Sequence, residues 1–411
     1  MKQVKIAVIG GGASGMMAAI SAAKNGAAVT ILEATKRVGN KILLTGNGKC
    51  NFTNLLLDTS CYYCKDEDFV TNIMEKFSPK DTQTFFENAG MLVKNKNGYL
   101  YPSGEQASIV LDILRMELKR QNVNILTETK VTKITKEQSG FCVETENQTT
   151  YTFDKIILTT GGRAYPKTGS DGSGYKLAKK LGHSIVPTVP ALVQLCGRDD
   201  FYKIIAGVRS EGKITLLIDE KMVRTERGEI QFTDYGISGI PIFQVSRLAA
   251  YGLFEKKKVT IVADVLPDYE KEDLQKLICQ RIPLHKDNTL EEFLCGFSNK
   301  KLCLLAIRLS GKKPDTPVKG LKEEELLQVV YVLKNLVFHI VDTKSYDTAQ
   351  VTAGGVSVFE LDETLQSKCT ENLYFAGEII DVDGICGGYN LQWAFASGYV
   401  AGKAAAAIRK E

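Results

Sequence analysis

The N-terminal stretch limits the fold more than any other part of the sequence. An apolar run at residues 4–9, interrupted only by Lys5, leads directly into the glycine-rich segment GGGASG at residues 10–15. A helical stretch follows, then a second apolar run at residues 28–32 and the acidic Glu33. Continuous apolar runs of this length are typical of parallel strands that are buried on both faces. The order of these elements predicts a strand–helix–strand unit, and therefore an α/β fold with a Rossmann-like dinucleotide-binding domain.

The glycines and the acid of this unit suit a dinucleotide ligand. Gly10 permits a tight turn, Gly12 lets the backbone approach a pyrophosphate, and Gly15 allows close packing of the helix on the strand. The helix N-terminus offers free amide groups to the phosphates. Glu33 is placed to accept hydrogen bonds from a ribose diol, and a carboxylate there disfavours the 2′-phosphate of NADP. The expected ligand is NAD or the adenosine half of FAD.

Two later segments favour FAD. Residues 155–160 (KIILTT) form a predicted buried strand that runs into Gly161, a turn that suits a backbone close to a cofactor. Near the C-terminus, a predicted short strand at residues 373–376 leads to Glu378, and residues 387–390 (GGYN) open a long helix. A helix N-terminus suits the electron-rich pyrimidine carbonyl of a flavin. The acid before it could hold a ribityl hydroxyl.

Several segments in chain order carry a family resemblance: GGGASG with Glu33, KRVGNKILLTGNGKCNFTN, TTGGRAYPKTGSDGSGYKLAKKLGH, FTDYGISGIP, TAGGVSV and NLYFAGEIIDVDGICGGYNLQWAFASGYVAG. In these segments, which extend over nearly the whole chain, the sequence resembles the HI0933-like family of FAD-dependent oxidoreductases, also called aminoacetone oxidase-like. The resemblance implies a tightly bound FAD in a two-dinucleotide-type FAD-binding domain, interrupted by an inserted β-rich and helical substrate domain. Members are reported as amine oxidases and as reductases of oxo-bile acids and steroids.

We expect the FAD-binding domain to comprise residues 1–187 and 345–411, and the substrate domain to comprise residues 188–344. The change of pattern within the insert supports this division, because strands precede charged amphipathic helices. The predicted parts are a β-rich part at 188–268 and a helical part at 269–344, with helices around 269–282 and 321–338.

The segment LLTGNGKCNFTN at residues 43–54 wraps the flavin in the resembling family. Its glycines would allow close approach to the isoalloxazine, Thr45 and Asn47 can hydrogen-bond to it, and Lys41 can face the pyrophosphate. The residues expected to bind FAD are Gly10, Gly12, Ala13, Ser14, Gly15, Glu33, Ala34, Lys41, Thr45, Gly46, Asn47, Gly48, Val131, Thr160, Gly161, Gly377, Glu378, Gly388, Tyr389, Asn390 and Leu391.

The sequence identifies no catalytic residue. Arg163 and Tyr165 follow the Thr-Gly-Gly turn and are the nearest polar candidates for a general acid, but a structural role in the turn is the favoured interpretation. Cys50 and Cys386 are expected to be small packed residues beside glycines, and His183 is expected to cap a helix C-terminus. Flavin chemistry needs few catalytic protein groups, since the cofactor carries the reaction.

The preferred function is reduction of a carbon–carbon double bond conjugated to a ketone in a hydrophobic substrate such as an oxo-bile acid or steroid, with hydride from flavin N5. An oxygen-dependent amine oxidase of the aminoacetone type, releasing hydrogen peroxide, is the alternative within enzymes. From other classes, a flavin-dependent RNA modifier or a non-catalytic flavin-binding protein stays open. Only one GxGxxG unit is present, so NADH or NADPH is expected at most as a transient reductant.

Composition bounds the partners. A net charge of +4 from 52 basic and 48 acidic residues argues against nucleic acid as a partner. The small hydrophobic molecule expected as the partner is what the family resemblance implies. The most apolar stretch, 391–408, contains Gln392 and Lys403 and predicts a core helix, so we expect a cytoplasmic protein without membrane insertion. Ten scattered cysteines with a single CxxC at 61–64 indicate reduced thiols and no metal site. No particular oligomeric state is indicated.

Overall fold

The computed structural model describes residues 3–407 and divides the chain into two compact units. The first, which we call the discontinuous unit, extends to Pro190 and resumes at Tyr346. The second, the inserted unit, comprises Ala191–Ser345. Residues 1–2 and 408–411 lie outside the described residues. They are the two ends of the expected FAD-binding domain, and residue 408 is also the last residue of the apolar stretch 391–408.

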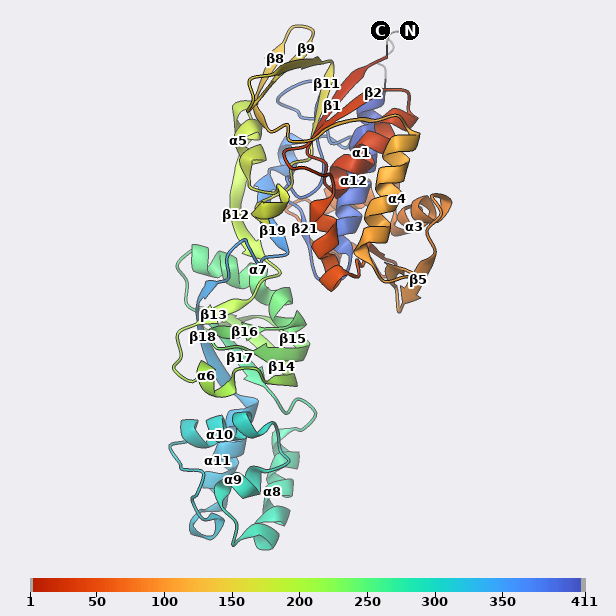
Figure 1. Ribbon diagram of the computed structural model, residues 1–411. Helices are drawn as coiled ribbons and strands as arrows, with labels where there is room; N and C mark the ends of the chain where they lie inside the picture. The colour runs from red at the N-terminus through yellow and green to blue at the C-terminus, as the bar shows by residue number, and fades with distance from the viewer. Residues whose placement is uncertain (1–2, 408–411) are drawn as a thin grey trace. The chain divides into compact units, whose positions relative to one another are not determined.

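A five-stranded parallel sheet forms the centre of the discontinuous unit (Figure 1). Its strands in spatial order are β20 (Leu373–Phe375), β11 (Lys155–Leu158), β1 (Lys5–Ile9), β2 (Ala28–Leu32) and β7 (Asn124–Leu126). Three consecutive residues of β1, at positions 6–8, are fully buried, because the sheet is covered on both faces. Helix α1 (Ala13–Lys24) connects β1 to β2. The predicted strand–helix–strand unit and the α/β fold class are confirmed.

Helices α1 and α12 (Tyr389–Ala406) lie side by side (Figure 1). In α12, a Cβ added at Gly398 or Gly402 would overlap the carbonyl oxygens of Ser14 or Ala18 in α1. The small residues of α12 therefore let the two helix backbones approach closely. Within residues 3–407, no helix is long and apolar enough to span a membrane.

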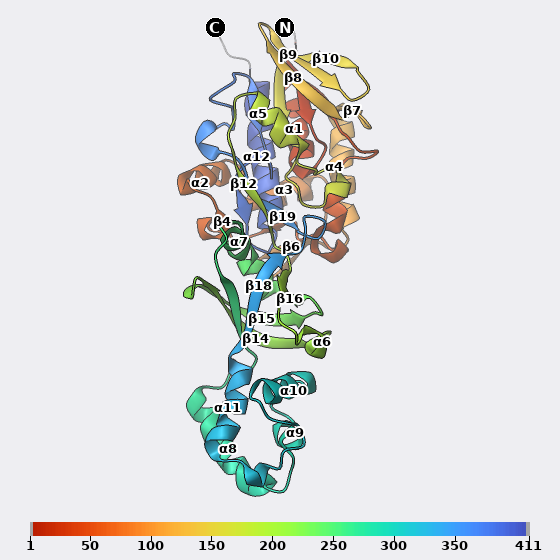
Figure 2. The ribbon, with the colours of Figure 1, turned by 90° about the vertical axis from the view of Figure 1, so that its left-hand side faces the viewer.

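The remaining elements of the discontinuous unit surround this sheet. Strands β8, β9 and β10 form a separate antiparallel sheet (Figure 2), and two smaller sheets, β3-β6-β5 and β21-β4, lie near the start of α12. Their bounds, with those of the other helices and strands, are β3 Thr53–Asn54, β4 Tyr62–Tyr63, α2 Glu67–Lys76, α3 Pro79–Asn88, β5 Val93–Lys96, β6 Tyr99–Pro102, α4 Ala107–Arg120, β8 Val131–Glu137, β9 Gly140–Thr145, β10 Thr150–Phe153, α5 Ser173–Lys180, β12 Ile185–Ala191, β19 Val351–Val356 and β21 Asp383–Gly384.

The inserted unit contains a closed antiparallel barrel with the strand order β13-β16-β15-β14-β17-β18. Apolar side chains fill it, among them Ile214, Phe232 and Phe338. The bounds of its elements are β13 Leu195–Gly197, α6 Tyr202–Ile205, β14 Arg209–Ile218, β15 Lys221–Phe232, β16 Gly236–Ser238, α7 Ile240–Phe254, β17 Val259–Asp264, α8 Lys271–His285, α9 Leu290–Leu294, α10 Lys300–Leu309, α11 Glu323–Lys334 and β18 Leu336–Thr343.

The end of this unit corrects one prediction. The helix expected at 321–338 is α11, which already ends at Lys334. The expected helical part, 269–344, therefore ends in a strand, β18, and not in a helix. From Leu336 onward, buried and exposed residues alternate, which is the period of a strand with one buried face. β18 pairs with both β17 and β13, so the barrel can close only if this segment is extended.

Candidate functional site

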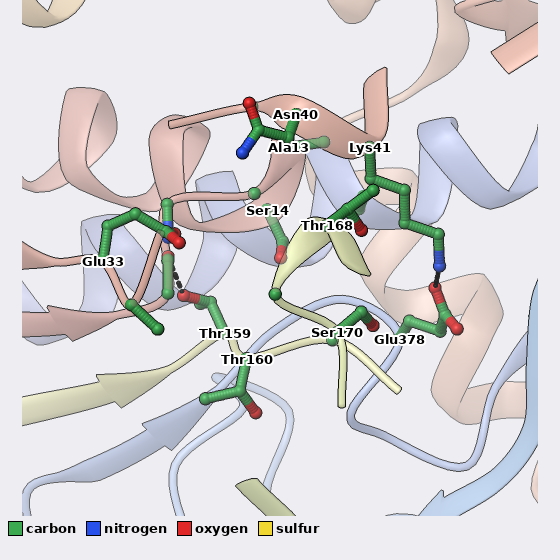
Figure 3. A pocket seen from close by; sticks show the side chains of 18 of the residues that line it. Ala13, Ser14, Glu33, Asn40, Lys41, Thr159, Thr160, Thr168, Ser170 and Glu378 are labelled. Atoms are coloured by element: carbon green, nitrogen blue, oxygen red, sulfur yellow. Dashed lines mark hydrogen bonds and ion pairs between the residues drawn. The ribbon is translucent and has the colours of Figure 1, made fainter. Parts of the chain in front are cut away.

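A cavity lies at the carboxyl ends of three neighbouring parallel strands of the discontinuous unit (Figure 3). Ile9 at the end of β1, Leu32 at the end of β2 and Thr159 just after β11 all line it. Ligands of open α/β sheets bind at this edge. The Thr159 hydroxyl donates to the carbonyl oxygens of Ile9, at 3.0 Å, and Gly10, at 2.7 Å. This side chain therefore ties the end of β11 to the glycine turn.

The glycine turn presents the N-terminus of α1 to the cavity. Gly12, Ala13 and Ser14 line the cavity, and no side chain in the described part of the chain caps this helix. A Cβ built on Gly12 would have no heavy atom of residues 3–407 within 4 Å. At Gly15, by contrast, a Cβ would overlap the Gly10 carbonyl oxygen. Gly12 thus leaves open space beside free amides, which fits a pyrophosphate, whereas Gly15 serves packing.

The Glu33 carboxylate lies at the end of β2 and is only 7% exposed. One oxygen accepts from the Gly11 amide at 2.7 Å. The other accepts from both the amide and the hydroxyl of Thr35, each at 2.7 Å. A carboxylate has about four acceptor positions, so roughly one remains for a ribose hydroxyl. The side chain is rigidly held, and its remaining capacity fits one hydrogen bond rather than a full diol.

An ion pair crosses the cavity between segments that are far apart in the sequence. Lys41 Nζ lies 2.5 Å from Glu378 Oε2, as Figure 3 shows. The other oxygen, Glu378 Oε1, accepts from the Thr352 amide at 2.9 Å. The Thr352 hydroxyl in turn accepts from the amides of Arg163, at 2.7 Å, and Ala164. One hydrogen-bond chain therefore joins the loop after β2, the turn after β11, strand β19 and the turn after β20.

Two buried hydroxyls beside the cavity have no hydrogen-bond partner within residues 3–407. They belong to Thr160 and Ser170, and both residues line the cavity. The Thr160 hydroxyl lies against Gly174 and the Ser170 hydroxyl against Gly161, where an added Cβ would overlap them, so neither oxygen opens onto the cavity. What fits a polar, elongated group such as FAD is the open space at Gly12 beside the free amides of α1.

The N-terminus of α12 faces the same cavity. Asn390 and Leu391 in its first turn line the cavity, and no side chain among the described residues caps this helix. The Asn390 side chain is occupied, because it exchanges two hydrogen bonds of 2.8 Å with the backbone of Gly384. The backbone amides of this turn, rather than the asparagine amide, are what the helix offers to a ligand.

The structure brings together most of the residues expected to bind FAD. Those that line the cavity are Gly10, Gly12, Ala13, Ser14, Glu33, Ala34, Lys41, Thr45, Val131, Thr160, Gly161, Glu378, Asn390 and Leu391. The others lie outside the lining: Gly15, Gly46, Asn47, Gly48, Gly377, Gly388 and Tyr389. Residues 46–48 are exposed, whereas Gly377 packs on Ser14, where a Cβ would overlap the serine hydroxyl. These glycines have backbone or packing roles.

Sequence reasoning missed one polar segment of the lining, residues 168–173. Thr168, Gly169, Ser170 and Ser173 line the cavity, and a Cβ on Gly169 would lie 3.4 Å from Glu33 Oε1. The sequence carries a signal for this segment, since TGSDGS is rich in glycine and serine and follows the Thr-Gly-Gly turn. Two other lining residues also escaped prediction: Asn40, inside the segment KRVGNKILLTGNGKCNFTN, and Gln350, just before TAGGVSV.

The cysteines that drew attention in the sequence are not activated thiols. Cys50 is fully buried, and burial raises the pKa of its thiol to about 12, although a hydrogen bond from Thr45 lowers it slightly. Burial likewise raises the pKa of Cys386 to about 12. A nucleophilic cysteine needs a lowered pKa. Both thiols are therefore neutral packing groups.

The remaining candidates also have structural partners. The Arg163 guanidinium stacks on the Tyr346 ring at 4.4 Å, and the Tyr165 amide donates to the Tyr346 carbonyl. His183 contacts Glu360 through Nδ1, at 3.0 Å, and Ser367 through Nε2, at 2.8 Å. Within residues 3–407, His183, Glu360 and Cys369 form the one grouping with metal-ligand spacing, but both ring nitrogens of the histidine are already hydrogen-bonded.

Comparisons with known proteins agree with this geometry. The family model described as HI0933-like protein Rossmann domain matches residues 4–404. The chain is 43% identical to the 3-dehydro-bile acid delta(4,6)-reductase of Clostridium scindens, over 98% of this chain and 99% of that protein. It is 29% identical to the ribosomal RNA dihydrouridine synthase of Escherichia coli, over 97% of both. Among solved structures, the 3-ketosteroid delta1-dehydrogenase of Sterolibacterium denitrificans resembles it in fold, with a TM-score of 0.51 and 12% identity over 99% of this chain and 100% of that one.

Proposed function

The chain belongs to the HI0933-like family of FAD-dependent oxidoreductases, and from that premise we propose that it reduces a carbon–carbon double bond conjugated to a ketone in an oxo-bile acid or steroid. The observation that carries this proposal is the 43% identity, over nearly the full length of both chains, to a 3-dehydro-bile acid delta(4,6)-reductase. In such a name, the delta positions denote double bonds and 3-dehydro denotes a 3-oxo group. A double bond at position 4 is conjugated to that ketone.

The cavity residues would hold FAD along its length. The amides at the start of α1 would bind the pyrophosphate beside Gly12, and Glu33 would accept from the adenosine ribose. Lys41, Glu378 and the first turn of α12 would surround the flavin end. When bound, FAD supplies hydride transfer at its N5.

The reaction needs one hydride and one proton for each double bond. The hydride adds to the β-carbon of the enone and the proton to the α-carbon, so a saturated ketone forms. Lys41 is a charged donor in the cavity lining, but its ammonium is paired with Glu378. NADH or NADPH is part of the proposal as the transient two-electron donor that makes turnover continuous.

An anaerobic half-reaction tests the proposal. The purified protein, carrying its FAD, is reduced by light with EDTA and mixed with a 3-oxo-Δ4 bile acid or steroid. The matched control compound is the same ketone without the double bond. We expect the absorbance of oxidised flavin to return with the enone alone, and mass spectrometry to find a product heavier by two hydrogens. Reoxidation by air alone, with peroxide release and amine consumption, would instead support the aminoacetone-type oxidase.

A second candidate is reduction of uridine in RNA, which the 29% identity to a ribosomal RNA dihydrouridine synthase favours. The chemistry is related, since the C5–C6 double bond of uridine is also conjugated to a carbonyl. A cavity in the inserted unit is lined by Arg198, His339 and three lysines at 256–258. Two of these lysines are paired with Glu255 and Glu220, which weakens the cavity as a phosphate site. Dihydrouridine formed in ribosomal RNA, with no response to the steroid enone, would favour this candidate.

A further inference from the structure

The segment from Asn51 to Asn54 does not line the cavity, yet it contacts the helix that does. Within residues 3–407, the cavity lining from this part of the chain ends at Thr45. Residues 51–54 are buried or nearly so, and they carry an unusual number of side-chain hydrogen bonds for a short stretch. Their partners indicate what the segment does.

Thr53 contacts the first turn of α12 directly. Its hydroxyl donates to Gln392 Oε1 at 2.6 Å, and both side chains are fully buried. The amide nitrogen of Gln392 donates to the Phe77 carbonyl at 3.1 Å, so the orientation of this amide is determined. Gln392 lies next to Leu391, which lines the cavity. The hydroxyl of Thr53 therefore contacts the residue that directly follows a cavity-lining residue in the chain.

Asn54 contacts the turn that precedes the helix. Its Nδ2 donates to the Gly387 carbonyl at 3.1 Å and to the Tyr389 hydroxyl at 3.0 Å. The Tyr62 hydroxyl donates to the Tyr389 carbonyl from the neighbouring sheet at 2.9 Å. The side chain of Asn54 is fully buried, so these bonds are shielded from water.

Asn51 packs against Gly388, the N-cap residue immediately before α12. A Cβ built on Gly388 would lie 2.5 Å from Asn51 Oδ1, so only glycine fits there. Gly388 also has a φ of 88°, a conformation that other residues rarely adopt. Asn51 itself is fixed by hydrogen bonds from Nδ2 to the carbonyls of Thr53 and Leu100.

From these contacts we propose that residues 51–54 are positioning residues for the flavin. They contact the first turn of α12 from outside the cavity, and they keep its free amides close enough to the flavin to stabilise its electron-rich pyrimidine end. The helix has no capping side chain in the described structure, so its amides stay available and its position must be set from behind. The field of a helix terminus decreases within about one turn, so a small displacement changes it. The inference rests on the proposed FAD site.

The test compares Thr53→Val with Thr82→Val. Both substitutions remove a fully buried threonine hydroxyl, but the Thr82 hydroxyl has no hydrogen-bond partner among residues 3–407. We expect Thr53→Val to weaken FAD binding about tenfold, because it leaves the Gln392 carbonyl buried and unpaired. We also expect a more negative midpoint potential for bound flavin, since a displaced helix terminus stabilises the reduced cofactor less. Thr53→Ser should restore both values.

FAD affinity is measured by titration of the apoprotein, the potential by reduction against a reference dye, and folding by the Tm of the apoprotein. Wild-type affinity and potential in Thr53→Val, with only the Tm lowered, would overturn the proposal and leave a purely structural role. If Thr53→Val does not fold, Tyr389→Phe decides, because it removes the hydroxyl that accepts from Asn54 and also contacts Cys61, and it should shift the potential in the same direction. Failure of the wild-type protein to bind FAD would instead contradict the proposed function.

Discussion

Gly12 provides the sharpest test of the cavity, because replacing it by alanine should separate stability from cofactor binding. Its φ of −74° and ψ of −170° are ordinary extended values that alanine adopts without strain. A Cβ there would have no heavy atom within 4 Å among residues 3–407. The apoprotein should therefore tolerate the methyl group. Alanine restricts the unfolded chain, which stabilises by about 0.4–1 kcal/mol, but Gly12 is the N-cap of α1, where glycine is preferred to alanine; these effects oppose each other, so the stability of the apoprotein should change by less than about 1 kcal/mol.

The same methyl group should weaken FAD binding, because it occupies the space in which the pyrophosphate would approach the α1 amides. Loss of one hydrogen bond to a charged group corresponds to about 1.5–3 kcal/mol. The dissociation constant of FAD should therefore rise about tenfold to a hundredfold. FAD titration of the apoprotein measures the affinity, and thermal or urea unfolding of the apoprotein measures the stability.

Gly26 offers a matched control with the opposite expectation. A Cβ there also meets no described atom within 4 Å, but the φ of 88° is in the left-handed region. Gly26→Ala should destabilise the apoprotein by about 1 kcal/mol and leave FAD affinity unchanged. Unchanged FAD affinity in Gly12→Ala would refute the assignment of the pyrophosphate to this turn. A loss of stability as large as that of Gly26→Ala would refute the open-space argument.

Three further predictions follow from single side chains. Glu33→Gln should weaken FAD binding about tenfold or more, because the amide cannot accept from both Gly11 and the two Thr35 donors while binding a ribose hydroxyl; unchanged FAD titration would contradict this role. Cys50→Ser should leave FAD binding and turnover largely intact, since the thiol is buried and neutral; loss of reductive turnover with FAD retained would reopen a nucleophilic role. Burial, opposed by Glu360, lowers the pKa of His183 below its ordinary value of 6.5, so the unfolded state binds more protons below that pH. The resulting stability is complete above about pH 6.5 and is lost as pH falls toward the folded pKa. Urea unfolding from pH 7 to 5 should show this decrease, and His183→Gln should reduce it; identical slopes in both proteins would exclude His183 as the cause.

Local patterns were sufficient to predict the sheet and the glycine turn. Apart from Lys5 and Thr30, strands β1 and β2 are apolar because both faces of the sheet are covered. The turn between β1 and α1 needs glycine at several adjacent positions. Glu33 was found because it stands directly after β2. In each case, the physical cause acts within a few residues of the chain, so the sequence itself displays it.

Contacts between distant segments could not be predicted in the same way. The pair of Lys41 and Glu378 depends on how the loop after β2 meets the turn after β20, so the sequence allowed each residue a separate role at the cofactor. The predicted helix at 321–338 extends into the first residues of β18, because only Asn335 separates the apolar residues of β18 from α11. Only its pairing with β13 and β17, which are distant in sequence, makes the extended form favourable.

The segment 43–54 shows that residues of one sequence motif can have two different roles. Direct flavin contact by its glycines stays a prediction; in the structure residues 46–48 are exposed, and the cavity lining from this loop, within residues 3–407, stops at Thr45. Thr53 and Asn54 instead hydrogen-bond to Gln392, Gly387 and Tyr389 around the start of α12, and Asn51 packs against Gly388. A residue that positions a helix leaves the same polar, glycine-rich signature as one that touches a ligand. Only the direction of its hydrogen bonds distinguishes them, and that direction is a property of the fold.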